Sequence, residues 1–171
     1  MFRRITDFMI CWKEEAAKTL LMLDSIPDAA MATAVNPEHR DLGRMAWHIV
    51  ESLIEMPGHC GMAIEGTHLI QGMFIGQAPA SMREVRDAYV RASESLLKGL
   101  AAWKDKDLEI EDEMYGEKWM RGKTLFVLIL HQTHHRAQMT VLMRQAELRV
   151  PDIYGPTKDG WANFGLEAPN V

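Results

Sequence analysis

The chain has 171 residues, of which 47% are hydrophobic and 25% charged, and this is enough for one compact domain with its own core. Its net charge of −5 argues against a nucleic-acid-binding protein, because such proteins usually present a basic surface. No apolar run approaches the roughly 20 residues that a membrane-spanning helix needs, so we expect no membrane partner. The two cysteines lack the spacing of a zinc ribbon or a redox motif. We therefore expect a cytoplasmic protein.

Apolar residues at intervals of three and four predict four amphipathic helices. Pro57-Gly58 should stop the second helix, and Ser81 with Glu84 has the pattern of a capping box at the start of the third. The predicted helices cover residues 5–25, 41–56, 81–103 and 124–148. This pattern indicates an all-α protein.

Two of the predicted connections are long for a bundle with simple up-and-down topology. Residues 59–80 are rich in glycine and loosely apolar, so we expect this segment to be functional or to contain a short element of its own. Residues 104–123 alternate apolar and polar side chains towards their end, which allows a short hairpin or an extended excursion. The expected fold is a four-helix bundle with two long crossover connections, formed by residues 1–150, and an extended C-terminal tail, 151–171, packed on the same domain.

The fourth predicted helix contains the run His131-Gln-Thr-His134-His135-Arg-Ala-Gln138. His131 and His135 are four residues apart and therefore project from one face of the helix. Their neighbours Leu128 and Met139 continue this face as an apolar stripe, so both imidazoles should point into the bundle. Two imidazoles at this spacing can bind one divalent metal ion.

A second interpretation of the same pair is that the histidines are core residues hydrogen-bonded to a carbonyl or a carboxylate. A third ligand from another helix would favour the metal site, because two protein ligands rarely hold a metal. Only His48 among the remaining candidates lies in a well-formed amphipathic helix. His134 is an alternative partner of His131 at a spacing of three residues, but it faces a different side of the helix from His135.

The chain resembles the DinB superfamily of metal-binding four-helix bundles. The resemblance rests on Trp47-His48 in the second helix, on the run from His131 through Arg136 to Gln138, and on the tail segment Val150-Pro-Asp-Ile-Tyr-Gly155. It covers roughly residues 5–156. The familiar motif often has glycine where this chain has Ala137.

The resemblance implies a divalent metal held by His48, His131 and His135 at one end of the bundle, open to water and often in a homodimer. Zinc suits three imidazoles best, and nickel, iron and manganese are also compatible. Some relatives are thiol-S-transferases that use a low-molecular-weight thiol such as bacillithiol, one is a mycothiol-dependent isomerase, and many have no assigned reaction.

Three functions are therefore considered for this chain. The first is a metal-dependent transferase that joins a small thiol to a small electrophile, with the substrate held under the glycine-rich segment 59–80. The others are a metal-dependent hydrolase and a non-catalytic protein, which is either a stress-associated metal-binding protein or a metal-free four-helix interaction module with its histidines in hydrogen bonds. Glu51 lies one turn after His48, where it could hold that histidine or act as a catalytic base; the alternative is that Glu51 is a solvated charge beside the helix.

Overall fold

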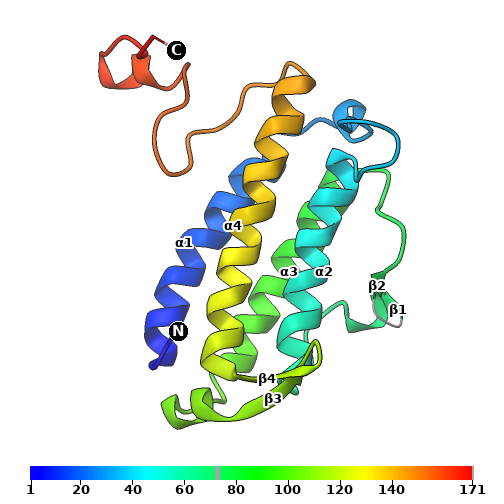
Figure 1. Ribbon diagram of the computed structural model, residues 1–171, viewed down its shortest axis with the longest axis vertical. Coiled ribbons are helices and arrows are strands. Elements are labelled where there is room, and N and C mark those ends of the chain that lie inside the picture. The colour runs from blue at the N-terminus through cyan, green and yellow to red at the C-terminus, as the bar shows by residue number, and fades with distance from the viewer. Residues whose placement is uncertain (72–73, 171) are drawn as a thin grey trace.

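A computed structural model describes residues 1–71 and 74–170 of the protein. Within these residues the chain forms four long helices, two short antiparallel hairpins and several 3-10 turns (Figure 1). The helices are α1 (Ile5–Asp24), α2 (Leu42–His59), α3 (Met82–Leu100) and α4 (Arg121–Gln145). The predicted all-α four-helix bundle is therefore confirmed. None of the described helices combines the length and the apolar character needed to cross a membrane.

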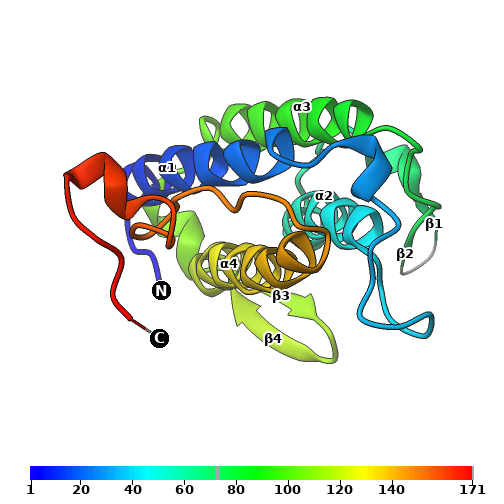
Figure 2. The same cartoon turned by 90° about the horizontal axis from the view of Figure 1, so that it is seen from above.

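The helices pack so that α2 contacts both α3 and α4, while α1 also contacts both α3 and α4. Figure 2 shows α1 and α3 along one side of the bundle and α2 and α4 along the other. The apolar stripes of the four helices meet between these two sides, where Trp12 and Tyr89 are completely buried. Trp12 donates a hydrogen bond from Nε1 to Ser93 Oγ over 2.9 Å, so the indole satisfies its polar group inside the core. The contact between α2 and α4 brings the predicted ligand helices together.

The second helix is longer than its sequence predicts. Pro57 lies inside α2, which continues to His59. Proline lacks only its own amide donor, and it stands in the last turn, where few helical hydrogen bonds remain to be broken. Its carbonyl accepts hydrogen bonds from the amides of Cys60 at 3.0 Å and Met62 at 3.2 Å, which stabilise the end of the helix.

The start of α3 also differs in detail from the expected capping box. Ser81 is the N-terminal capping residue, as predicted, but its side chain forms no capping hydrogen bond. The carboxylate of Asp28 takes this role from a distant segment, because it accepts a hydrogen bond from the amide of Met82 at 2.7 Å. The cap therefore ties the start of α3 to η1 (Asp28–Ala30).

The fourth helix ends at Gln145, three residues earlier than predicted. Glu147 adopts a left-handed conformation with φ of 57°, and the amide of Leu148 donates to the carbonyl of Met143 at 2.9 Å. These features form a Schellman motif, which usually contains glycine at the left-handed position. Because glutamate occupies that position here, the sequence gives no signal for this end.

Both long connections contain a hairpin. In residues 104–123, η3 (Asp105–Glu109) precedes β3 (Glu111–Met114) and β4 (Glu117–Met120), which pair antiparallel around a turn at Tyr115-Gly116. Of the two predicted alternatives for this segment, a short hairpin and an extended excursion, the hairpin is therefore the one that forms. In residues 59–80, η2 (Thr67–Leu69) precedes β1 (Ile70–Gln71) and β2 (Phe74–Ile75), while residues 72–73 lie outside the described part.

The C-terminal tail leaves the end of α4, crosses towards α1 and ends away from the bundle, with η4 (Trp161–Phe164) near its end (Figure 1). Tyr154 connects the tail to the bundle, because its hydroxyl hydrogen-bonds to Glu15 on α1 and to Arg136 on α4. Arg136 and Glu15 are 2% and 6% exposed, so this connection reaches a buried ion pair.

Candidate metal centre

Three histidines from two helices converge between α2 and α4. One ring nitrogen from each of His48, His131 and His135 lies within 4.8 Å of the other two. The ring centroids are 5.1 Å apart for His48 and His131, 4.6 Å for His48 and His135, and 4.4 Å for the pair on α4. The helical spacing of four residues explains the last distance, and the packing of α2 on α4 explains the other two.

His134 does not join this cluster. It is exposed, whereas His135 is buried and His131 half-buried. The step of one residue turns the side chain of His134 by about 100° around the helix axis, away from α2. The structure therefore brings together the three histidines named from the sequence and leaves their main rival outside.

Hydrogen bonds orient two of the three imidazoles. Nδ1 of His48 lies 2.5 Å from Oε2 of Glu51, and Nδ1 of His135 lies 2.7 Å from Oε1 of Gln138. Both partners are acceptors, so each Nδ1 carries a proton, and in the neutral ring Nε2 then has the lone pair that can bind a metal. Such a partner on the far nitrogen is characteristic of histidines that bind a metal.

The geometry and charge of the cluster fit a divalent metal ion. The Nε2 atoms of His131 and His135 are 3.2 Å apart, and two nitrogens on one tetrahedral zinc ion are roughly 3.3 Å apart. Burial, together with the smaller effect of the neighbouring histidines, lowers the pKa of both imidazoles to about 4, although the hydrogen bond with Gln138 raises that of His135. Both rings are therefore neutral near pH 7, which is the state that metal binding requires.

Glu51 is buried, with 4% of its surface exposed, so its interpretation as a solvated charge is wrong. Its Oε2 also lies 3.3 Å from Nη2 of Arg44. The reason is that α2 is covered on several sides, by α3, α4 and both hairpins, which makes its buried face wider than one stripe. Glu51 therefore stands behind His48, where it can fix the ring.

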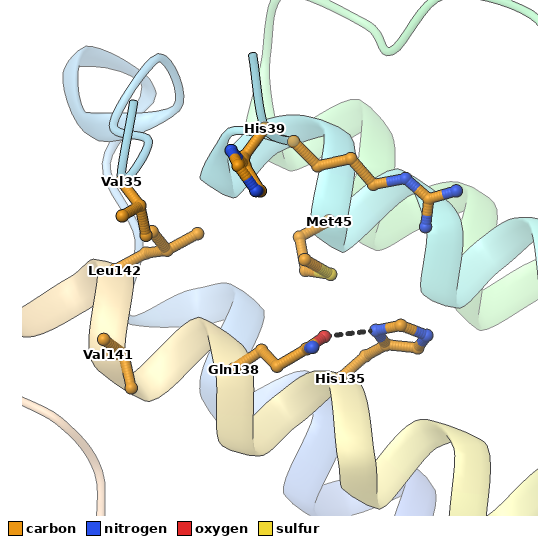
Figure 3. A pocket seen from close by; sticks show the side chains of 8 residues that line it. Val35, His39, Met45, His135, Gln138, Val141 and Leu142 are labelled. Carbon is orange, nitrogen blue, oxygen red and sulfur yellow. Dashed lines mark hydrogen bonds between the residues drawn. The ribbon is translucent and has the colours of Figure 1, made fainter. Parts of the chain in front are cut away.

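A cavity of about 380 Å³ opens beside the three histidines, with His135 and Gln138 in its wall (Figure 3). Its other lining residues come from the segment before α2, from α2 itself and from the end of α4: Val35, His39, Arg40, Met45, Val141 and Leu142. No residue of 59–71 or 76–80 lines it, and the expected position of the substrate under the segment 59–80 stays a prediction. Sequence patterns did not indicate the segment before α2, because it has neither helical periodicity nor a known motif.

The two cysteines do not take part in the cluster. Burial raises the pKa of Cys60 to about 11, and burial together with Glu15 raises the pKa of Cys11. Both thiols are therefore largely protonated near neutral pH and are poor nucleophiles.

The chain is similar in sequence and in fold to known proteins. The chain is 38% identical to the uncharacterized protein YrdA of Bacillus subtilis (strain 168) over 179 residues, covering all of both chains. A crystal structure of a DinB-like protein from Bacillus cereus ATCC 10987 matches with a TM-score of 0.79 and 35% identity, over 90% of this chain and 100% of the other. The fold is also that of the DinB-like protein YjoA from Bacillus subtilis, with a TM-score of 0.66 at 13% identity over 88% of this chain and 99% of the other.

The family assignment rests on the full length of the sequence. The model of the DinB family matches residues 1–169, which include both ligand helices and almost all of the tail. The chain belongs to the DinB family.

Proposed function

We propose that this protein binds one divalent metal ion through His48, His131 and His135 and catalyses the transfer of a small thiol to a small electrophile in the cytoplasm. The observation that supports this proposal is the combination of three converging imidazoles with a cavity that reaches one of them. Three protein ligands leave at least one coordination position for a substrate, whereas a structural site is closed by four. Zinc is the metal that this ligand set suits best.

A bound divalent metal lowers the pKa of a thiol or a water molecule and so supplies a nucleophile near neutral pH. The chain itself supplies the position of the reacting groups. His135 and Gln138 lie in the wall of the cavity, so an electrophile held there is next to the histidine cluster. In the reaction the thiol sulfur forms a bond to carbon, the carbon–leaving-group bond breaks, and the thiol proton passes to solvent or, for an epoxide, to the new alkoxide.

Glu51 and Gln138 act in this proposal as positioning residues. Glu51 lies 2.5 Å from Nδ1 of His48 and is buried, so its carboxylate acts through that histidine. Oε1 of Gln138 lies 2.7 Å from Nδ1 of His135, so Gln138 positions that ring in the same way. Each fixes the tautomer that leaves Nε2 free, and loss of such a partner typically weakens metal binding by roughly 10–100-fold.

The metal-loaded protein is expected to accelerate conjugation of a low-molecular-weight thiol to chlorodinitrobenzene or to an epoxide. Cysteine, glutathione and bacillithiol would each be assayed with metal-loaded and chelated protein side by side. The rate should rise with pH through a value below the roughly 8.5 of a free thiol, because the metal stabilises the thiolate. His131→Ala should lose this acceleration of thiol conjugation, as the chelated protein does.

A different result would assign a different function to the same site. If the metal stays bound and no thiol reacts faster than in buffer, the transferase proposal fails. Ester and amide substrates, tested with the same samples, would then identify a hydrolase. Absence of turnover with every substrate would leave a non-catalytic metal-binding protein of the stress-associated kind.

We also propose a homodimer, as the family resemblance implies. Two apolar side chains on the outer face of α4 support it, since Phe126 and Leu130 are 38% and 50% exposed and lie one turn apart. Light scattering at micromolar concentration should give about twice 19.5 kDa, and Leu130→Glu should shift the protein towards the mass of one chain. A monomer mass for the unsubstituted protein would contradict the proposal.

A further inference from the structure

The cavity beside the histidine cluster has an apolar body. Much of its wall is formed by Val35, Met45, Val141 and Leu142. In Figure 3, Val35, Val141 and Leu142 lie on one side of the opening, and Met45 faces them across it. Val35 and Val141 are 61% and 52% exposed, although both are valines that would ordinarily be buried. Its volume of about 380 Å³ is at the lower end of the roughly 300–1,000 Å³ of small-molecule sites. The cavity therefore fits a small, largely apolar molecule.

None of the described polar side chains that line the cavity is negatively charged. Arg40 lines it and forms no ion pair with any residue in the ranges 1–71 and 74–170. No carboxylate is among the described residues of the wall, since Glu51 is directed to His48 and Arg44 behind the cluster. An arginine without a partner beside an apolar wall can form a charge-assisted pair with an anion.

His39, the other polar residue on this side, is held in place. Its Nδ1 lies 2.6 Å from Oδ1 of Asn36, which also accepts a hydrogen bond from the amide of Glu38 at 3.0 Å. The carboxamide oxygen is an acceptor, so Nδ1 of His39 carries the proton of this hydrogen bond. The guanidinium of Arg40 supplies the permanent positive charge on this side of the cavity.

The segment that carries these groups is fixed to α2 by its backbone. The amide of Leu42 donates to the carbonyl of Thr33 at 2.9 Å, and the amide of Gly43 donates to the carbonyl of Met31 at 2.8 Å. A Cβ atom at position 43 would lie 3.0 Å from the side chain of Met31, so glycine permits this close approach. The wall with Val35 and Arg40 is therefore part of the folded structure.

We propose that the cavity selects a small molecule that combines an apolar body with an anionic group, and that Arg40 binds the anion. This inference deepens the proposed function and rests on it, because it names the class of electrophile that would be placed beside His135. Val35, Val141 and Leu142 hold the apolar body. The carboxylate or phosphate of such a molecule pairs with the guanidinium at the edge of the cavity.

The test uses three probes with the same six-carbon chain: hexanoate, hexyl phosphate and hexan-1-ol. Their dissociation constants would be measured by NMR titration of metal-loaded and of chelated protein. The unsubstituted protein should bind both anions more tightly than the alcohol in either form. Arg40→Gln should weaken binding of the anions about tenfold and leave the alcohol unchanged, because it removes one charge-assisted contact. The order of the two anions identifies the preferred group.

Two further variants separate charge from shape. Arg3→Gln is the matched control, because Arg3 is also exposed and forms no ion pair among the described residues. The N-terminus, to which it is close in sequence, lies at the opposite end of the bundle from the start of α2 and the end of α4 (Figure 1). Arg3→Gln should change none of the three constants. Val141→Ser should weaken all three probes alike, because it removes apolar wall and no charge.

The chelated samples keep this inference distinct from the metal proposal. If the preference for anions survives in Arg40→Gln, or disappears from the unsubstituted protein on chelation, the metal and not Arg40 is the anion receptor and the inference is overturned. Equal affinity for hexanoate and hexan-1-ol also overturns it. If the protein binds no metal, the proposed function fails, while the titration of metal-free protein still decides the role of Arg40.

Discussion

Replacement of any one of His48, His131 and His135 by alanine is expected to reduce the metal content of the purified protein to about a tenth or less. Each substitution removes one of only three protein ligands, and two ligands rarely hold a divalent metal against a chelator. The structure makes the three positions equivalent in this respect, because one nitrogen of each lies within 4.8 Å of the others. Metal analysis after dialysis against a weak chelator measures the effect.

The remaining histidines provide the controls for this experiment. His39 and His68 are both exposed and stand outside the cluster, so His39→Ala and His68→Ala should keep the metal. His134→Ala should have a smaller effect than the ligand variants, since its ring centroid lies 5.0 Å from that of His135 and only packs beside it. Full retention of metal in His135→Ala would contradict the ligand assignment.

Substitution of Glu51 or Gln138 should give an intermediate result. Glu51→Ala and Gln138→Ala leave all three imidazoles in place but remove the partner that fixes a ring. We expect metal affinity to fall by roughly 10–100-fold, which competition with a coloured chelator resolves. If the variant at position 51 lost as much metal as His48→Ala, Glu51 would instead be a ligand of the metal.

The bundle and its histidine cluster were predictable because both depend on short-range periodicity. The spacing of four residues placed His131 and His135 on one face, and the surrounding apolar residues directed that face inwards. The position of His48 required in addition that α2 and α4 be neighbours, which the resemblance implied and the packing of the helices shows.

Other features depend on contacts between distant segments and were not predictable in the same way. Glu51 seemed to occupy a polar flank, and only the covering of α2 by several elements buries it. The capping of α3 by Asp28 crosses 54 residues of sequence. The cavity wall from Val35 to Arg40 is placed by backbone hydrogen bonds to α2, which no side-chain pattern reveals.

The ion pair between Glu15 and Arg136 is another feature that depends on contacts between distant segments. Glu15 follows Lys13 and Glu14 in a charged stretch of α1, yet it is 6% exposed. Arg136 donates to Oε2 of Glu15, to the carbonyl of Glu15 at 3.1 Å and to Oγ1 of Thr19 at 2.8 Å. Burial raises the pKa of Glu15, but hydrogen bonds from Lys18 and Tyr154 and the charge of Arg136 outweigh burial and lower the pKa overall. The carboxylate is therefore charged and paired inside the protein.

Arg136→Met is expected to lower the free energy of unfolding by about 3–5 kcal/mol, because it removes the buried cation that pairs with the buried carboxylate of Glu15. The double variant Glu15→Gln with Arg136→Met should recover much of this loss, since no unpaired charge then remains. Lys18→Met is the matched control: Lys18 also pairs with Glu15, at 2.6 Å, but its side chain is 25% exposed, and the loss should be about 1 kcal/mol or less. Urea unfolding of the metal-free proteins measures all four free energies without a contribution from the metal.

The same series shows whether the tail depends on this pair. Tyr154 reaches Glu15 and Arg136 from the tail, so Tyr154→Phe removes the hydroxyl that connects tail and bundle while keeping the ring. We expect a loss of about 1 kcal/mol and faster cleavage of residues 151–170 by a protease under native conditions. If the free energy of unfolding of Arg136→Met lies within about 1 kcal/mol of that of the unsubstituted protein, the buried ion pair adds little stability. The histidines on α4 are then held in place by the apolar packing of α4 on α2 alone.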